Sequence, residues 1–209
     1  MKFKKLVTAL LFMPAWTMRA QTTLSMTGEY YLRGMTEVAS GFKLNNDSTF
    51  QFFFSYGALD RFGTGSWQVN NGKLVLNSRP QPEKDFAIVT SKAVPGNQTT
   101  IRIIDNNTFL LPYIHVKLTP GSDQSIMTDN KGMIVMPRQS LDSIALLFEF
   151  CPERYSTFSI ADPTHNFFEF RFEPWLMEVF FKDFNLGVDN KSLYGKHPLL
   201  QGTEFRYNK

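Results

Sequence analysis

Apolar and polar side chains alternate with a period of two along much of the chain, most clearly in residues 49–56. Phe50, Phe52 and Phe54 occupy every second position there, and polar residues such as Gln51 lie between them. Successive side chains of an extended strand point to opposite faces of its sheet, so a strand with one buried face has this pattern. We therefore predict a half-buried strand over this segment.

A second alternating segment contains a turn signal at its centre and predicts a β-hairpin over residues 66–76. Trp67 precedes the triplet 70–72 (Asn-Asn-Gly), and Leu74 and Leu76 follow it at alternate positions. Asn and Gly tolerate the positive φ angles of a tight hairpin turn. The two halves of the segment are therefore expected to pair with each other as antiparallel strands.

Further short alternating runs are separated by turn residues, and hardly any segment has a helical period. The other expected strands lie around residues 30–32, 42–44, 100–105, 113–118, 125–127, 133–136, 144–150, 166–173, 177–184 and 203–207. Only residues 175–184 also fit a helical turn. Turns at intervals of about 8 to 12 residues are typical of sandwiches. We predict an all-β fold with an antiparallel barrel-like sheet and a β-sandwich-like segment.

Proline and glycine clusters divide the chain into segments. Residues 79–82 (Arg-Pro-Gln-Pro) cannot continue a central strand, and Pro95-Gly96 is a second breaker. We therefore expect an antiparallel barrel-like segment over residues 21–95, a sandwich-like segment over 96–162 and further strands over 163–209. Whether these last strands return to complete the first sheet, which would make the middle segment an insertion, stays open at this point.

The N-terminus has the three parts of an export signal. Residues 1–5 are basic, residues 6–16 are apolar, and a short stretch that contains the small residue Ala20 follows. The apolar run is too short for a membrane-spanning helix, which needs roughly 20 apolar residues. We predict a signal peptide over residues 1–20, cleaved after Ala20, and hence a periplasmic or secreted protein.

Charge and cysteine content limit the classes of partner. The full chain has a formal net charge of +3, but residues 1–20 hold four of its 22 Lys and Arg residues and no Asp or Glu. The remaining 18 cations and 19 anions leave a net charge of −1, which gives no long-range attraction for nucleic acid or an anionic membrane. The single cysteine, Cys151, lies far from the expected cleavage site, so neither an internal disulfide nor a lipid anchor is expected.

The first third of the chain resembles the lipocalin-like small-barrel proteins that Gram-negative bacteria export. The resemblance rests on residues 41–44 (Gly-Phe-Lys-Leu), 47–52 (Asp-Ser-Thr-Phe-Gln-Phe), 63–67 (Gly-Thr-Gly-Ser-Trp) and 74–76 (Leu-Val-Leu). It implies an up-and-down barrel whose mouth or interior holds an apolar ligand.

The middle of the chain resembles the transthyretin-like regulatory domain that is attached to carboxypeptidases. The matching residues are 100–105, the proline-led strand 111–118, and the turn 128–132 (Thr-Asp-Asn-Lys-Gly) followed by Ile134. Such domains are small sandwiches that serve as non-catalytic folding or interaction modules. The resemblance therefore implies that residues 98–162 are an adaptor.

Candidate catalytic and metal-binding residues are scattered. His115 alternates with apolar neighbours and is expected to face solvent from a strand, and His165 and His197 are expected in loops. No two histidines have the close spacing of a zinc motif. Cys151 follows an apolar run, where a free cysteine behaves as a small apolar residue. The chain also contains no nucleophile elbow or phosphate-binding glycine loop, so we predict no enzyme activity, metal or cofactor.

The segment most suited to ligand recognition is residues 55–65, which connects the Phe-rich strand to the Trp67 hairpin and is longer than a minimal turn. It combines aromatic surface with an acid and a guanidinium, a mixture that is common in recognition loops. The candidate ligand-binding residues are Tyr56, Asp60, Arg61, Phe62 and Trp67. The alternative is that Asp60 and Arg61 merely close a hairpin whose glycines permit sharp bends.

Two classes of function follow from these features. The first is an exported carrier whose aromatic faces line a pocket for an apolar small molecule. The second is a scaffold protein whose middle segment docks on another exported protein, with the same aromatic residues serving as core. Binding of an apolar dye or lipid would favour the carrier, and a defined protein partner would favour the scaffold.

Overall fold

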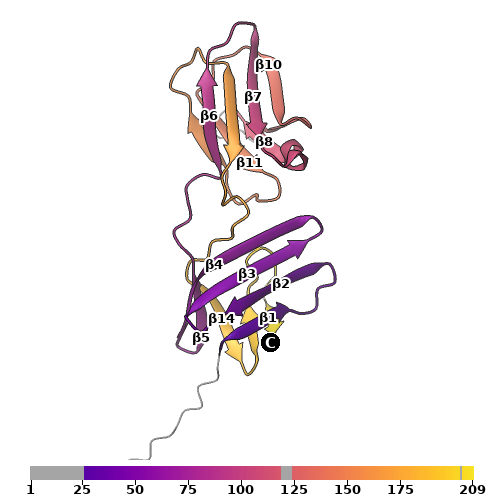
Figure 1. The fold of residues 1–209 in the computed structure, drawn as a ribbon, viewed down its shortest axis with the longest axis vertical. Helices are drawn as coiled ribbons and strands as arrows, with labels where there is room; N and C mark the ends of the chain where they lie inside the picture. The colour runs from indigo at the N-terminus through magenta and orange to yellow at the C-terminus, as the bar shows by residue number, and fades with distance from the viewer. Residues whose placement is uncertain (1–25, 119–123, 203) are drawn as a thin grey trace, which may run out of the picture.

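Strands dominate the described part of the chain. The computed structural model describes residues 26–118, 124–202 and 204–209, so the expected signal peptide lies outside the described residues. The fold is all-β, as the alternation predicted, with a closed antiparallel barrel and two further sheets (Figure 1). One 3-10 helix, η1 (Thr108–Tyr113), lies between strands. Among the described residues, no helix has the length and apolar character needed to cross a bilayer.

An eight-stranded barrel forms one end of the molecule (Figure 1). Its strands are β1 (Gly28–Leu32), β2 (Val38–Leu44), β3 (Thr49–Tyr56), β4 (Leu59–Asn70), β5 (Lys73–Asn77), β14 (Phe184–Asp189), β15 (Ser192–Gly195) and β16 (Phe205–Asn208). Strands β1 to β5 pair in chain order, β5 then pairs with β14, and β16 pairs with β1 to close the barrel. The C-terminal strands therefore complete the first sheet, and everything between β5 and β14 is an insertion.

The insertion is a sandwich of two four-stranded sheets. Its strands are β6 (Phe86–Lys92), β7 (Gln98–Ile104), β8 (Ile114–Lys117), β9 (Ile126–Met127), β10 (Met133–Pro137), β11 (Ser143–Phe148), β12 (Ser156–Ser159) and β13 (Phe167–Phe172). One sheet has the order β10-β7-β13-β6 and the other β12-β11-β8-β9. Strands β7 and β13 run parallel, whereas the other pairs are antiparallel. Apolar side chains from both sheets form one core.

The boundaries expected after residues 95 and 162 both fall inside the sandwich. Strand β6 lies before the first of them and β13 after the second, and these two strands pair with each other over their whole length. Their rings also meet, since the centroids of Phe86 and Phe172 are 5.2 Å apart in the sandwich core. The chain instead crosses between the two units in residues 78–85 and 173–183, and the proline-rich sequence lies in the first crossing.

Aromatic rings fill the inside of the barrel. Phe42, Phe52 and Phe181 are almost completely buried, and their ring centroids lie between 5.1 and 6.0 Å apart. Gly63 makes room for them, because a Cβ atom at this position would lie 2.7 Å from the ring of Phe181. The inward-facing rings of β3 are therefore packed core residues.

The second crossing contributes to both cores. Leu176 packs in the sandwich core, whereas Val179 and Phe181 pack in the barrel core. The strand expected over residues 177–184 is reduced here to one bridge between Glu178 and Phe62, because the chain turns where the N–H of Glu178 donates to the carbonyl of Trp175. A turn in place of a strand lets residues as close in sequence as Leu176 and Val179 reach opposite units.

Candidate ligand-binding groove

The hairpin between β3 and β4 is tighter than the sequence indicated. Tyr56 pairs with Leu59, so the turn consists of Gly57 and Ala58 alone. Gly57 has a φ of +59°, which glycine adopts at little cost, and a two-residue turn therefore suffices. Residues 60–62 lie in strand β4, and the prediction of a long recognition loop was wrong.

Alternation along β4 sends neighbouring candidate residues to opposite faces. Phe62 points outward and is 47% exposed, whereas Arg61 points into the end of the barrel and is 6% exposed. Asp60 is exposed on the outer face, beside Ser55 of β3. Arg61 and Phe62 therefore cannot contact one ligand together.

The other two candidate residues lie away from Phe62. Trp67 is half-buried against the barrel core, and its indole N–H donates to the carbonyl of Asn45 at 3.1 Å. Tyr56 is exposed at the end of the β3–β4 hairpin, in a shallow depression that Met35 and Leu200 also line. The five candidate residues thus do not form one site.

An aromatic row crosses the outer face of the barrel. Tyr31, Gly41, Phe53 and Phe62 lie directly opposite one another on β1, β2, β3 and β4. The three rings of this row are 42%, 39% and 47% exposed, respectively. Phe53 covers the glycine, since a Cβ atom on Gly41 would lie 2.9 Å from its ring, and its centroid is 6.1 Å from that of Tyr31.

A polar row runs beside the aromatic row, two residues along each strand. It consists of Glu29, Lys43, Gln51 and Thr64, again in direct register. The ammonium of Lys43 lies 3.2 Å from the carboxylate of Glu29, which also accepts a hydrogen bond from the hydroxyl of Tyr31 at 2.5 Å. These two contacts, the hydrogen bond from Tyr31 first, lower the pKa of Glu29 and keep its carboxylate ionised.

Between the two rows the outer face forms an open groove of about 460 Å³. Phe42, Phe52 and Gly63, which face the barrel interior, line the groove between the two rows, and the hydrogen-bonding side chains of the polar row lie along one side. Of the five candidate ligand-binding residues, only Phe62 lines this groove. Phe53 and Tyr31 were detectable as aromatic residues at the outward positions of alternating strands, but their register across four strands was not.

The other side of β4 faces the junction between the barrel and the sandwich. The guanidinium of Arg61 contacts the carboxylate of Glu153 at 2.6 Å and donates to the carbonyl of Met177 at 3.3 Å. A small cleft of about 150 Å³ lies beside this pair. Arg61 therefore links the barrel to the sandwich and to the second crossing.

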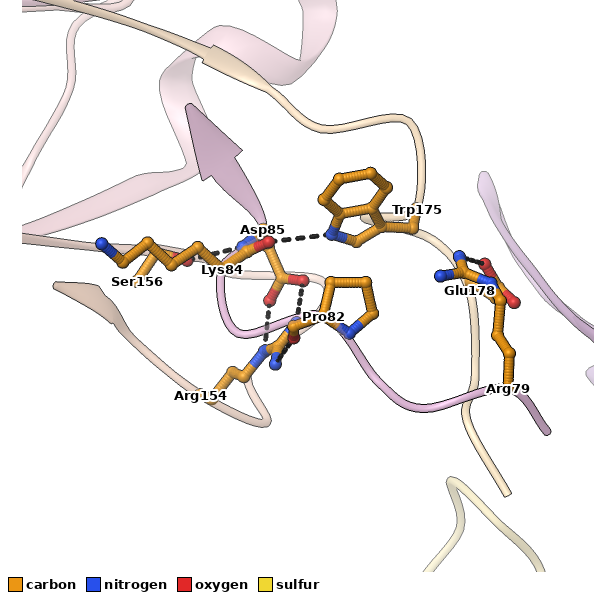
Figure 2. Close-up of polar contacts among 8 residues, drawn as sticks. All are labelled: Arg79, Pro82, Lys84, Asp85, Arg154, Ser156, Trp175 and Glu178. Carbon is orange, nitrogen blue, oxygen red and sulfur yellow. Dashed lines mark hydrogen bonds and ion pairs between the residues drawn. The ribbon is translucent and has the colours of Figure 1, made fainter. Parts of the chain in front are cut away.

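Further polar contacts tie the crossings together (Figure 2). Arg154 forms a two-pronged ion pair with Asp85, at 2.5 and 2.9 Å, and also donates to the carbonyl of Pro82. The indole of Trp175 donates to the carbonyl of Lys84 at 2.8 Å. Figure 2 also shows the ion pair between Arg79 and Glu178, whose closest atoms are 2.5 Å apart. These contacts between residues of the chain itself stabilise the junction of the barrel and the sandwich.

His197 lies in the connection between β15 and β16, as expected, but its side chain is buried in the end of the barrel. Its Nδ1 accepts hydrogen bonds from the N–H groups of Leu199 and Leu200, both at 3.0 Å. The proton therefore resides on Nε2, which donates to the hydroxyl of Ser40 at 3.0 Å. Burial lowers the pKa of His197 to about 4, so the imidazole is neutral at neutral pH.

The remaining reactive side chains are partnered or buried. Cys151 lies in the sandwich core, and burial raises the pKa of its thiol to about 12, which leaves little thiolate. His165 is 2.7 Å from the hydroxyl of Ser91, and His115 is 3.2 Å from that of Ser125. In the part of the chain that the structure describes, no three His, Cys, Asp or Glu side chains are grouped so as to hold a metal ion.

Comparisons of the chain with protein-family models, with curated proteins and with solved structures found no match. Inferences about function therefore rest on the geometry of the chain itself.

Proposed function

We propose that the chain is an exported, non-catalytic binding protein whose ligand lies in the groove on the outer face of the barrel. The observation that carries this proposal is the aromatic row, where Tyr31, Phe53 and Phe62 expose their rings next to a row of hydrogen-bonding side chains. Exposed aromatic surface bordered by polar residues is typical of recognition sites on rigid scaffolds.

The barrel interior supports an internal carrier site less well. The residues expected to line such a pocket are Phe50, Phe52, Phe54 and Trp67; the three phenylalanines are at most 5% exposed, and Trp67 is half-buried against the barrel core. Phe50 and Phe52 also pack on Phe181, with ring centroids 5.1 and 5.3 Å apart. An apolar ligand would have to displace these contacts, whereas the outer groove is open without rearrangement.

Two finer assignments belong to the same proposal. The barrel is proposed to be lipocalin-like, and the support is its eight strands in up-and-down order. The insertion is proposed to be transthyretin-like, and the support is its two small sheets around one core. Both assignments would make the chain a rigid scaffold that presents binding surfaces, rather than an enzyme.

Nuclear magnetic resonance can test the binding site without knowledge of the natural ligand. Proton–nitrogen correlation spectra of the purified protein would be recorded separately with neutral hexasaccharides, with short extended peptides and with a medium-chain fatty acid. Shifts of the Phe53 and Phe62 amide signals with any of these classes support the outer groove. Shifts confined to the interior side of the barrel, around Phe181 and Leu186, or no shifts at all, overturn it.

The second candidate function is a scaffold that docks another exported protein through the sandwich. Three aromatic residues there favour it: Phe109 is 85% exposed, and the half-exposed rings of Tyr113 and Phe150 lie 4.8 Å apart. Capture of one defined exported protein that is lost with Phe109→Ser and retained with Phe62→Ser would favour this candidate. The opposite pattern would favour the groove.

A further inference from the structure

We infer that the occupant of the outer groove is a neutral glycan chain, an inference that rests on the proposed binding function. The groove presents two kinds of surface in parallel, the aromatic row and the polar row. A pyranose ring has two surfaces that match these rows, because its C–H groups form an apolar face and its hydroxyl groups project from the edge. Stacking on an aromatic ring and hydrogen bonding to the neighbouring row can then occur together.

The charge of the groove favours an uncharged ligand. Glu29 and Lys43 are the charged residues among the described residues that line it, and their carboxylate and ammonium lie 3.2 Å apart and neutralise each other. The other members of the polar row, Gln51 and Thr64, are neutral and offer both donors and acceptors. The described residues that line the groove offer no unpaired cation to an anionic polymer, whereas hydroxyl groups can both donate to Glu29 and accept from Lys43.

The shape of the groove favours a chain over a single small molecule. The aromatic row extends from β1 to β4, and neighbouring strands are about 4.8 Å apart, so the row is roughly 14 Å long. The groove is open, which suits a polymer that enters and leaves at its ends. A disaccharide or longer oligosaccharide would contact Phe53 and a ring on either side of it.

The barrel also disfavours an extended peptide added as a strand. Strand addition needs an unpaired sheet edge. Here β1 pairs with β16 and β2, and β4 pairs with β3 on one side. On its other side, β4 contacts residues 177–179 and then β5. A ligand in this groove must therefore bind through side chains, which is how sugar rings are held.

The test measures the affinity of the purified protein for neutral linear hexasaccharides by titration calorimetry. The probes are maltohexaose, cellohexaose, xylohexaose, mannohexaose and laminarihexaose, with oligogalacturonate as the anionic comparison. Native gels that contain the corresponding soluble polysaccharides distinguish a free oligosaccharide from a glycan within a polymer. We expect saturable binding of at least one neutral glycan and at least tenfold weaker binding of oligogalacturonate.

The chain offers a matched pair of variants for this test. Phe53 covers Gly41 on the outer face, and Tyr194 covers Gly187 in the same way on another part of the barrel. Phe53→Ser and Tyr194→Ser therefore each remove a ring that covers a glycine, together with one further contact of that ring, to Tyr31 and to the guanidinium of Arg206, respectively. We expect Phe53→Ser to weaken glycan binding at least tenfold and Tyr194→Ser to leave it unchanged, with similar thermal unfolding temperatures. Phe62→Ser provides a second, independent loss of binding.

The outcomes separate this inference from the proposed function. No neutral glycan binding, together with a peptide or a fatty acid that shifts the amide signals of the aromatic row, overturns the glycan and keeps the groove. Equal weakening by Phe53→Ser and Tyr194→Ser overturns the inference as well, because stability would then explain the loss. If no class of ligand shifts the row, both proposals are wrong.

Discussion

The guanidinium of Arg61 lies 2.6 Å from the carboxylate of Glu153, and this contact joins strand β4 of the barrel to the chain that follows β11 in the sandwich. The two side chains have different surroundings, since that of Arg61 is 5% exposed and that of Glu153 is 46% exposed. Loss of the carboxylate would leave a buried cation whose other acceptor is the carbonyl of Met177. Loss of the guanidinium would leave a carboxylate that water can solvate.

This asymmetry predicts unequal effects of the two substitutions. Glu153→Ala should lower the free energy of unfolding by about 2 kcal/mol, because a charge-assisted hydrogen bond is lost and the guanidinium stays buried. Arg61→Met should lower it by less than half as much. Urea unfolding followed by the fluorescence of Trp67 and Trp175 measures both changes.

The double variant is the control for this interpretation. With both groups removed, no buried charge remains, so the Arg61→Met/Glu153→Ala protein should be at least as stable as Glu153→Ala alone. Equal losses of unfolding free energy in the two single variants, or additive losses in the double variant, would show that burial of the unpaired cation does not cause the larger effect of Glu153→Ala.

Arg61 also illustrates what local sequence could predict. Alternation correctly indicated the strand that ends at Tyr56, because the direction of a side chain in a strand depends only on its neighbours, but the prediction of a loop at Arg61, which lies in β4, was wrong. The partner of Arg61 is 92 residues away in sequence. Whether an acid, an aromatic residue or solvent meets such a side chain depends on how distant strands pair, and no local pattern encodes that pairing.

The same reasoning applies to the groove and to the domain boundaries. Alternation places Phe53 on the face of β3 that points away from the core. Only the register of four strands brings it into line with Tyr31 and Phe62. Likewise, Pro95-Gly96 resembled a boundary, yet β6 before it pairs with β13, whose sequence begins about 70 residues later.

His197 predicts a pH dependence of stability. The pKa of His197 is about 4 in the folded chain, below the ordinary value of 6.5 for a histidine, so the unfolded chain binds more protons between these pH values. The contribution of the neutral imidazole to the free energy of unfolding is therefore complete above pH 6.5 and is lost as the pH falls towards about 4. The full loss should be on the order of 3 kcal/mol.

The difference between His197 and a non-titrating substitute isolates this effect. An Asn side chain can also accept from the N–H groups of Leu199 and Leu200, so His197→Asn should be less stable at pH 7.5 but should change less between pH 7.5 and 4.5. Urea unfolding at both pH values gives the comparison. Parallel changes in the two proteins would mean that other groups cause the acid sensitivity.

Gly63 provides a test of whether the barrel interior is filled. An alanine in the middle of a strand ordinarily stabilises it by about 0.5 to 1 kcal/mol relative to glycine, because the unfolded chain is less flexible. At position 63, however, the new Cβ atom would lie 2.7 Å from both the ring of Phe181 and the backbone oxygen of Val179. Overpacking of this kind costs about 1 to 3 kcal/mol, so Gly63→Ala should destabilise the barrel.

The sign of this change distinguishes a packed barrel from a hollow one. Thermal unfolding of Gly63→Ala would be compared with that of Ser66→Ala, which changes an exposed position of the same strand and should have little effect. A lower unfolding temperature for Gly63→Ala alone supports an interior occupied by Phe181 and its neighbours. A higher unfolding temperature would mean that the ring of Phe181 can move aside. The barrel interior would then again be a candidate site for an apolar ligand.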